Sequence, residues 1–493
     1  MTAPPYGTSV PGNRWDLAPD AAHRRRVSAV VTHFEQQEQL DRTLAALRRQ
    51  TRPPDEVIVS DDGSRRPPTV PAGVRLVRQH DAGFRAAAAR NLGVGASTGE
   101  LLVLLDADTA PEPAFVERMV ALPEALPEAL AVGRRRHADL AGTSPGQPIE
   151  QVAPPLELPE PAWLRDAYAA SRDLLDADAS SHRFVISAVL ACSRWWYDEV
   201  GGFDETFRAY GGEDWDFAHR SWTAGGLLAH RPDAVAWHDG PDAGAREHDA
   251  DARLAETVAV ADRTSAPSTT WRGLARGPAD LVVTCAPLLS DAELLVTVDS
   301  LLAALPRAVV RLSERHRDLV GADPRVVVAE GDPPASARLH LELRRGLFGD
   351  AGGWVSLLDG LDGSTASRGI SDGRAELQDL RLLRRAARWG RPALAPAGPS
   401  LATSLHPWTE GDTLASWLGG WAGASTAREA GTASQRQGGP PMSNPSNESD
   451  AGRPQDGADH GTDHEQEPVG AEVGMSDEGS TFEPEEDPEG HAD

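Results

Sequence analysis

An unbroken apolar run that ends in two aspartates constrains this chain more than any other feature. Residues 101–105 are all Leu or Val, and Asp106-Ala107-Asp108 follows directly. Such a short, wholly apolar run is typical of a buried strand in a parallel sheet. Because Asp is also a common turn residue, the two carboxylates alone are better explained by an ordinary strand-to-loop turn than by a cation site.

Strand-like and helix-like segments alternate around this run. Strands are predicted at 27–34, 55–64, 73–80 and 100–108, and helices at 35–50 and 84–97. This alternation predicts an α/β fold with a largely parallel sheet and crossover connections. The acidic residues follow the second and fourth strands, at the carboxyl ends where open α/β sheets bind ligands.

The length of 493 residues indicates more than one domain. We expect a flexible N-terminal arm, a first α/β domain, a connector, a second smaller α/β domain and a disordered acidic tail, at 1–25, 26–245, 246–278, 279–422 and 423–493. In the second domain, 281–305 echoes the pattern of 27–47, and 350–364 echoes 97–111. A degenerate copy of the first domain and an unrelated small α/β domain both remain open.

Composition excludes several classes of protein. The formal net charge is -27, and residues 451–493 hold 14 acidic residues against one arginine, which argues against nucleic acid as a partner. Cys192 and Cys285 are too few for a disulfide framework. Because neither an apolar leader nor a bilayer-length apolar run is present, we expect a cytoplasmic protein without a transmembrane segment. Peripheral contact with the inner face of a membrane remains open.

Two further segments offer ligand-binding groups. Asp62 follows the second strand and precedes Gly63, so its carboxylate is a candidate acceptor for a nucleobase or ribose, although Asp-Gly is also a common turn. Arg85 and Arg90 lie at and within the predicted small-residue helix, where an arginine can pair with a phosphate. Either arginine is equally compatible with an ordinary surface position.

The segment 200–225 supplies a candidate base. Glycine pairs at 201–202 and 211–212 bracket an acidic stretch, and Glu213-Asp214 then open a predicted helix. A carboxylate at a helix N-terminus is stabilised in its charged form and can accept a proton, although helix starts are rich in acidic residues anyway. His238 follows another short strand, and a lone histidine is more often structural than a ligand.

The order of these motifs resembles that of the family 2 glycosyltransferases. "DDGS", "GFRAAAARNLG", "GELLVLLDADT", "GGFDETFRAYGGEDWDFAHR" and "WHDG" follow one another over roughly 25–240. The "GGFDE…GGED" segment resembles in particular the chondroitin-polymerase-like branch, which transfers galactosyl or N-acetylhexosaminyl groups. The resemblance implies the A-type nucleotide-sugar fold, with a mixed, mostly parallel central sheet flanked by helices.

The resemblance also implies a set of site residues. Those implied to bind the nucleotide sugar are Thr32, Phe34, Asp62, Arg85, Asn91 and Asp106. Mn²⁺ or Mg²⁺ is implied at Asp108 and His238, with Asp106 beside it. Asp214 is the implied general base and Glu213 its neighbour. One departure is "VVTHFEQQEQ" in place of Pro-Thr-Tyr-Asn: Phe34 retains a stacking ring without a hydroxyl, and Glu35 replaces an amide.

The predicted function is metal-dependent, inverting transfer of a hexose or N-acetylhexosamine from a nucleotide sugar, with UDP expected, to a hydroxyl of a glycan, cell-envelope or lipid-linked acceptor. One alternative is a sugar- or partner-binding scaffold, which should have lost the base or the metal pair. The other is a nucleotidyltransferase, which should carry a glycine-rich basic loop after the first strand, where this chain has "THFEQQEQ". The sugar, the acceptor and the oligomeric state stay open.

Overall fold

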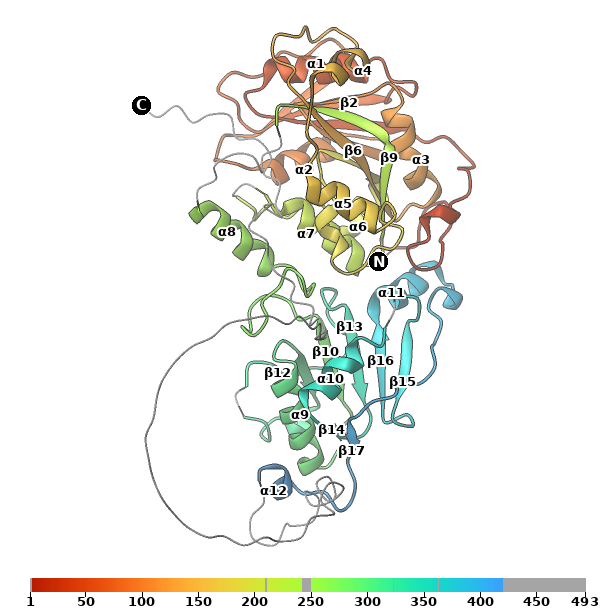
Figure 1. The fold of residues 1–493 in the computed structure, drawn as a ribbon, viewed down its shortest axis with the longest axis vertical. Helices are drawn as coiled ribbons and strands as arrows, with labels where there is room; N and C mark the ends of the chain where they lie inside the picture. Colours follow the sequence, from red (N-terminus) through yellow and green to blue (C-terminus); the bar gives the residue numbers. More distant parts are fainter. Residues whose placement is uncertain (1, 209–210, 242–249, 322, 362, 420–493) are drawn as a thin grey trace, which may run out of the picture. The chain divides into compact units, whose positions relative to one another are not determined.

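The computed structural model describes residues 2–208, 211–241, 250–321, 323–361 and 363–419 (Figure 1). It divides into two compact units, and all the extended sheets lie in the first, which includes residues 1–412. Of the second unit, the described part contains the short helix α12 (Leu414–Trp417). The predicted acidic tail, 423–493, lies outside the described residues.

The larger sheet is mixed, with strand order β3-β2-β1-β4-β8-β6-β9-β5 and β7 paired to β6. Its strands are β1 (Val27–His33), β2 (Glu56–Asp61), β3 (Val74–Arg78), β4 (Leu101–Asp106), β5 (Thr109–Pro111), β6 (Ala129–Ala138), β7 (Glu157–Leu158), β8 (Val189–Ser193) and β9 (Leu227–Asp239). Strands β3, β2, β1 and β4 run parallel, and β8 pairs antiparallel to β4. The predicted mostly parallel sheet is therefore confirmed, and its order places β1 and β4 side by side in the interior.

The helices of this region form where the sequence shows helical spacing. They are α1 (Gln37–Leu47), α2 (Ala86–Ala96), α3 (Phe115–Ala125), α4 (Ile149–Val152), α5 (Ala162–Ala170), α6 (Arg194–Val200), α7 (Glu213–Thr223) and α8 (Ala250–Ala261). Helix α1 buries Leu40, Leu44 and Leu47, the leucines whose spacing predicted it. Helix α2 packs on β1, β2 and β3, and its alanines keep the helix close to the sheet. These contacts fix the loop before α2 at the carboxyl ends of the strands.

Residues 2–25 are packed against the larger sheet, which differs from the loose arm that we predicted. Val10 is buried, and the Asn13 side chain donates to the carbonyl oxygens of Leu174 (2.6 Å) and Leu228 (2.9 Å). The Leu228 amide donates back to Asn13 Oδ1 at 3.0 Å. The proline and glycine content suggested a flexible arm. The Asn13 side-chain amide instead bonds two segments that are distant in the sequence, and these bonds fix the arm at that point.

The second sheet has the order β12-β11-β10-β13-β16-β15. Its strands are β10 (Leu281–Cys285), β11 (Val309–Leu312), β12 (Val326–Val328), β13 (Leu339–Leu343), β15 (Ser367–Ile370) and β16 (Ala375–Asp379); β14 (Leu347–Phe348) pairs separately with β17 (His406–Pro407). The helices are α9 (Asp291–Ala304), α10 (Ala351–Leu358) and α11 (Leu380–Trp389). Strands β12, β11, β10 and β13 are parallel and β16 is antiparallel to β13, as in β3-β2-β1-β4-β8.

One predicted element of this region is wrong. The segment 350–364 was expected to echo the strand before Asp106, but it forms the helix α10. Asp350 accepts the Gly353 amide as a helix cap, and Trp354 and Leu357 are buried three positions apart on one face. Short apolar runs do not distinguish a buried strand from a buried helix. The strand that matches β4 in the sheet order is β13.

Helix α11 is held to the first α/β region by a buried carboxylate. Glu128 and Arg385 are both fully buried and form an ion pair, and Arg388 Nη1 and Trp389 Nε1 also donate to Glu128, at 3.2 and 2.8 Å. A buried charge is stable only when it is paired in this way. Both sheets therefore belong to one unit, and experiments on this protein are best made with the full chain.

Candidate active site

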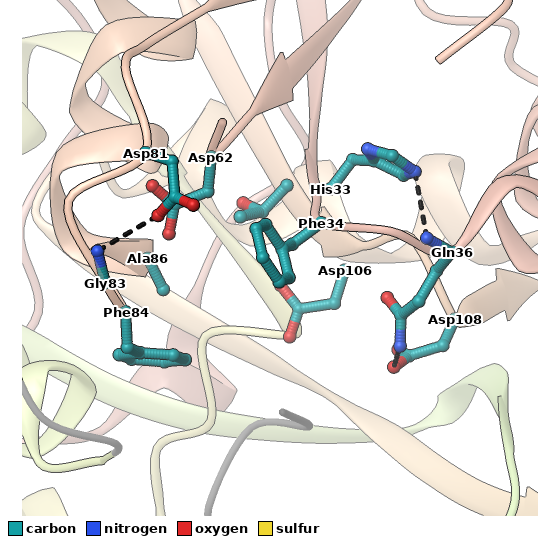
Figure 2. A pocket seen from close by; sticks show the side chains of 11 residues that line it. His33, Phe34, Gln36, Asp62, Asp81, Gly83, Phe84, Ala86, Asp106 and Asp108 are labelled. Carbon is teal, nitrogen blue, oxygen red and sulfur yellow. Dashed lines mark hydrogen bonds between the residues drawn. The ribbon is translucent and has the colours of Figure 1, made fainter. Parts of the chain in front are cut away.

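A pocket of about 740 Å³ opens at the carboxyl ends of β1, β2 and β4, where the sequence placed its aspartates (Figure 2). Its lining is Thr32, His33, Phe34, Gln36, Asp62, Asp81, Gly83, Phe84, Ala86, Asp106 and Asp108. Five of the predicted site residues are therefore brought together here: Thr32, Phe34, Asp62, Asp106 and Asp108. The parallel register that aligns Thr32 with Asp106 causes this convergence.

Asp62 forms one wall and is buried. Its carboxylate accepts the backbone amide of Arg85 at 2.8 Å and a hydrogen bond from Gln79. Burial raises the pKa of Asp62, and these two donors only partly offset that effect. Gly63, with φ of +94°, lets the chain turn against Asp81, whose amide nitrogen would lie 2.4 Å from an added Cβ.

Two sequence predictions near this wall change. Arg85 contacts Asp62 through its backbone amide, and its side chain is not part of the described pocket lining. Asn91 does not line the pocket: its Nδ2 donates to Phe203 O and Glu205 Oε1, both at 2.9 Å, and its Oδ1 accepts the Phe203 amide at 3.0 Å. We therefore assign Asn91 to the support of the "GGFDE" loop, because tertiary contacts occupy its amide.

The β1–α1 turn is braced by an unpredicted group, His33 with Asp61. His33 Nε2 accepts the Gln36 amide at 3.2 Å, so Nδ1 carries the proton and donates to Asp61 Oδ1 at 2.8 Å. Burial acts to raise the pKa of Asp61, but hydrogen bonds from His33, Ser64 and Arg78 outweigh it and leave the pKa below its ordinary value. This brace sets the positions of Phe34 and Gln36, whose side chains are labelled in Figure 2.

Asp108 and His238 lie close together because β5, which directly follows Asp108, pairs with β9. Thr109 of β5 faces His238 of β9, and His238 Nε2 lies 3.7 Å from Asp108 Oδ2. Gln36 Nε2 donates to the same Asp108 oxygen at 3.1 Å. Burial lowers the pKa of His238 despite the charge of Asp108, so the imidazole is neutral near pH 7 and suited to binding a metal.

His137 is a neighbour that the sequence did not single out. It faces His238 across β6 and β9, with the ring centroids 4.9 Å apart, and the Nδ1 atoms of both rings lie 3.3 Å from Gly240 O. Burial lowers the pKa of His137 to about 2. Because neutral imidazoles donate to the same carbonyl, Nε2 of each ring is left as the lone-pair nitrogen.

Arg90 joins the two acidic motifs. Its Nη2 lies 2.9 Å from Asp106 Oδ1 and its Nη1 lies 2.8 Å from Glu213 Oε1, and the side chain is 1% exposed. The sequence offered Arg90 as one possible phosphate partner but gave no sign that it bridges carboxylates. The signal was only its place among the small residues of α2, where it is buried.

Asp214 lies beside Glu213 in the first turn of α7, after Gly212 with φ of +91°. Its Oδ1 accepts the Trp215 amide at 2.8 Å, and the Ser187 amide lies 3.5 Å from its Oδ2. Backbone donors and the helix N-terminus both favour the carboxylate form. Since Glu213 is tied to Asp106 by Arg90, the candidate base is positioned relative to the D-x-D motif.

The described residues contain no preformed cluster of three or more metal-ligating side chains. Asp108, which lines the pocket, and His238 nevertheless present one carboxylate and one neutral imidazole close to each other. This donor pair suits Mn²⁺, and substrate phosphates commonly complete such sites. Among the helices of the described ranges, none has the length and apolarity needed to cross a membrane.

Comparison with known families agrees with this geometry. Residues 28–185 match the model described as glycosyl transferase family 2, and residues 170–237 match that described as the N-terminal domain of galactosyltransferase. The first α/β region is a family 2 glycosyltransferase domain.

Curated relatives match the same region. Hyaluronan synthase from Pasteurella multocida is 31% identical over 46% of this chain and 26% of its own length. Chondroitin synthase from Pasteurella multocida (strain Pm70) is 28% identical over 48% of this chain and 27% of its own length. Validoxylamine A glucosyltransferase from Streptomyces hygroscopicus subsp. limoneus is 29% identical over 40% of this chain and 48% of its own length. The chain thus spans about a quarter to a half of these relatives.

Solved structures give more remote likenesses. GalNAc-T7 with UDP, GalNAc and Mn²⁺ aligns at a TM-score of 0.33 and 17% identity over 44% of each chain. Mannosyltransferase PcManGT from Pyrobaculum calidifontis with GDP-Man and Mn²⁺ aligns at a TM-score of 0.34 and 22% identity, over 46% of this chain and 60% of its own chain.

Proposed function

We propose that this protein transfers a hexosyl or N-acetylhexosaminyl group from a UDP-sugar to a hydroxyl of a glycan or lipid-linked acceptor, with inversion at the anomeric carbon. The observation that carries the proposal is the Arg90 bridge between Asp106 and Glu213. It places the D-x-D motif and the acidic start of α7 in one buried network. A scaffold that had lost catalysis would have no need to keep both motifs and the cation that joins them.

The pocket provides a place for the nucleotide. Asp62 offers carboxylate oxygens at one end, and Phe34 and Phe84 offer aromatic rings in the same lining. A planar base can stack on an aromatic ring while its N–H groups donate to a carboxylate. The raised pKa of Asp62 reflects its burial, and a base N–H would supply a further donor to that carboxylate.

Asp108 and His238 would hold Mn²⁺ or Mg²⁺, with Asp106 beside them. When bound, such an ion neutralises the diphosphate of the donor and makes it a better leaving group. His238 contributes Nε2, since Nδ1 is directed to Gly240 O. Gln36 holds Asp108 in place from the β1–α1 turn.

Asp214 would act as the general base. Its carboxylate takes the proton of the acceptor hydroxyl while that oxygen attacks the anomeric carbon and the bond to the nucleoside diphosphate breaks. One base that activates the acceptor from the side opposite the leaving group gives a single displacement with inversion. Glu213 does not take part in proton transfer here, because Arg90 neutralises it and fixes the start of α7.

For the second sheet, we propose a degenerate copy of the first that has lost catalysis. Thr284 of β10 faces Glu342 of β13, as Thr32 faces Asp106. Two residues later, at the position of Asp108, stands Arg344, whose Nη2 pairs with Glu342 and Glu376 at 2.8 and 2.6 Å. A guanidinium here neutralises the remaining carboxylates, so we expect this copy to act as a support or partner surface.

The proposal is tested by screening nucleotide sugars for Mn²⁺-dependent thermal stabilisation of the full chain. A ligand that binds the native state raises the melting temperature, so a selective shift identifies the donor. The selected donor is then incubated with candidate acceptors, and the anomeric configuration of the product is determined by NMR. Absence of stabilisation by every nucleotide sugar, or a product that retains configuration, would contradict the proposal.

A further inference from the structure

A second pocket, of about 630 Å³, lies beside β6, β9 and helix α5 and shares no residue with the first. Its lining is Arg134, Arg135, Glu160, Pro161, Leu164, Arg165, Tyr168, Ala169, Asp173, His230 and Pro232. Most of it belongs to 160–173, which joins the central strands to the segment leading to β8. None of the motifs that identify the donor site explains this pocket.

The wall is built around an aromatic stack. The rings of Tyr168 and His230 are 3.6 Å apart and 3° from parallel. His230 Nδ1 lies 2.7 Å from Asp173 Oδ1, which makes Nδ1 the donor and Nε2 the lone-pair nitrogen. Nε2 is buried and has no hydrogen-bond partner among the residues that the structure describes. A buried acceptor without a donor is costly, and a ligand hydroxyl that reached it would remove that cost.

The charges of the pocket are nearly balanced. Arg134 Nη2 pairs with Glu160 at 2.8 Å, and Arg165 Nη2 pairs with Asp166 at 2.9 Å. With three arginines against Glu160 and Asp173, the lining carries a surplus of only one positive charge, which is small for holding a polyanion such as a nucleoside diphosphate. Its proline, leucine and alanine side chains offer apolar walls between the polar groups. Apolar walls with a few convergent donors and acceptors suit a sugar ring, which has apolar faces and hydroxyl edges.

Short segments connect this pocket to both halves of the candidate active site. Tyr168 Oη donates to Phe184 O at 2.6 Å, and three residues later the Ser187 amide faces the Asp214 carboxylate. On the other side, Arg135 lies two residues before His137 on β6, about 7 Å along the strand. His137 in turn faces His238. Short chain paths therefore link the pocket to the proposed base Asp214 and to the proposed metal ligand His238.

Electrostatic coupling agrees with this placement. Burial raises the pKa of Tyr168 far above its ordinary value, with Asp173 and Asp214 adding to that effect and Arg135 opposing it.

We propose that this pocket is a subsite for one pyranose residue of the acceptor glycan, adjacent to the residue whose hydroxyl is attacked. The inference rests on the proposed glycosyltransferase function and deepens it, since it assigns the acceptor class as an oligosaccharide. Tyr168 and His230 form the polar and aromatic wall, and Pro161, Leu164 and Pro232 contact the apolar faces of the ring.

The test fills the pocket without removing any of its contacts. Ala169 and Ala170 are neighbouring exposed residues of α5, but only Ala169 lines the pocket. Ala169→Trp is compared with the matched control Ala170→Trp and with the wild-type full chain; Ala169→Phe is a smaller second variant should the tryptophan lower the melting temperature. Binding of cellotetraose and of a chondroitin tetrasaccharide is measured by saturation-transfer NMR without donor. UDP binding with Mn²⁺ is measured by calorimetry.

We expect at least one tetrasaccharide to bind the wild type and Ala170→Trp, and Ala169→Trp to bind it about tenfold or more weakly. UDP affinity should be the same in all three proteins. Equal tetrasaccharide binding by the two variants, or no binding by the wild type, would overturn the subsite. Failure of the proposed function has a different signature: the wild type would bind neither UDP nor nucleotide sugars, whatever happens at Ala169.

Discussion

Arg90 and Glu213, which lie 123 residues apart, form a buried ion pair with a separation of 2.8 Å between Nη1 and Oε1. The second arm of the same guanidinium holds Asp106 at the end of β4. A planar fork can satisfy two carboxylates at once in a fixed geometry. Arg90 therefore sets the distance between the D-x-D motif and the helix that carries the candidate base.

Replacing Arg90 with lysine tests this role. A lysine keeps the charge but cannot bridge two carboxylates in the same geometry, so we expect the free energy of unfolding to fall by about 1–3 kcal/mol. Catalytic efficiency should fall about tenfold or more as α7 loses its alignment. The measurements are urea denaturation and transfer kinetics, with the exposed Arg118→Lys as control. Unchanged kcat/KM in Arg90→Lys would refute a positioning role.

Replacing Asp214 with asparagine should separate binding from transfer. The amide keeps the size of the side chain but cannot accept the acceptor's proton, so we expect the transfer rate to fall by about 10²–10⁴-fold. The affinity for UDP with Mn²⁺, measured by calorimetry, should not change. Asp233→Asn, on the exposed part of β9, serves as the control. A transfer rate near that of the wild type would show that another residue is the general base.

The metal site is tested at Asp108. Asp108→Asn removes a charged oxygen donor, so we expect Mn²⁺ to strengthen UDP binding much less than in the wild type, by about tenfold or more. UDP binding in the absence of metal should stay close to that of the wild type. Asp81→Asn is a matched control, because Asp81 lines the same pocket and is not a proposed ligand. If both variants respond to Mn²⁺ alike, Asp108 is not a metal ligand.

Buried neutral histidines should make the fold sensitive to acid. Burial lowers the pKa of His182 from 6.5 to about 3. Between these two pH values, His182 binds a proton in the unfolded chain but not in the folded chain. Stability is therefore complete above pH 6.5 and is lost as the pH falls toward 3. The pKa values of His137, His219, His230 and His238 are lowered as well.

The contribution of His182 can be isolated by denaturation at pH 7.5 and 5.5. Over this range the wild type should lose about 1.4 kcal/mol through His182 alone, and His182→Gln should lose that much less. The exposed His23→Gln is the control and should behave like the wild type. An equal loss in wild type and His182→Gln would show that His182 is protonated in the folded state.

The sequence by itself determined the sheet, most of the first pocket and the enzyme class. Strands, helices and the acidic strand ends follow from local periodicity, and parallel strands bring their carboxyl ends to one edge whatever the details of packing. For that reason Asp62, Asp106 and Asp108 could be expected at one edge before any contact was known, whereas Thr32 was implied by the resemblance to family 2 glycosyltransferases. The same local reasoning failed at 350–364, because a short apolar run fits a helix as well as a strand.

Only the tertiary structure decided which polar groups meet. Arg90 bridging Asp106 and Glu213, His137 beside His238, and the use of Asn91 by the "GGFDE" loop depend on register between segments far apart in the chain. So does the Tyr168–His230 stack that builds the second pocket. Periodicity specifies how each element presents its faces, whereas pairing of buried charges and rings depends on long-range packing, which a linear pattern does not encode.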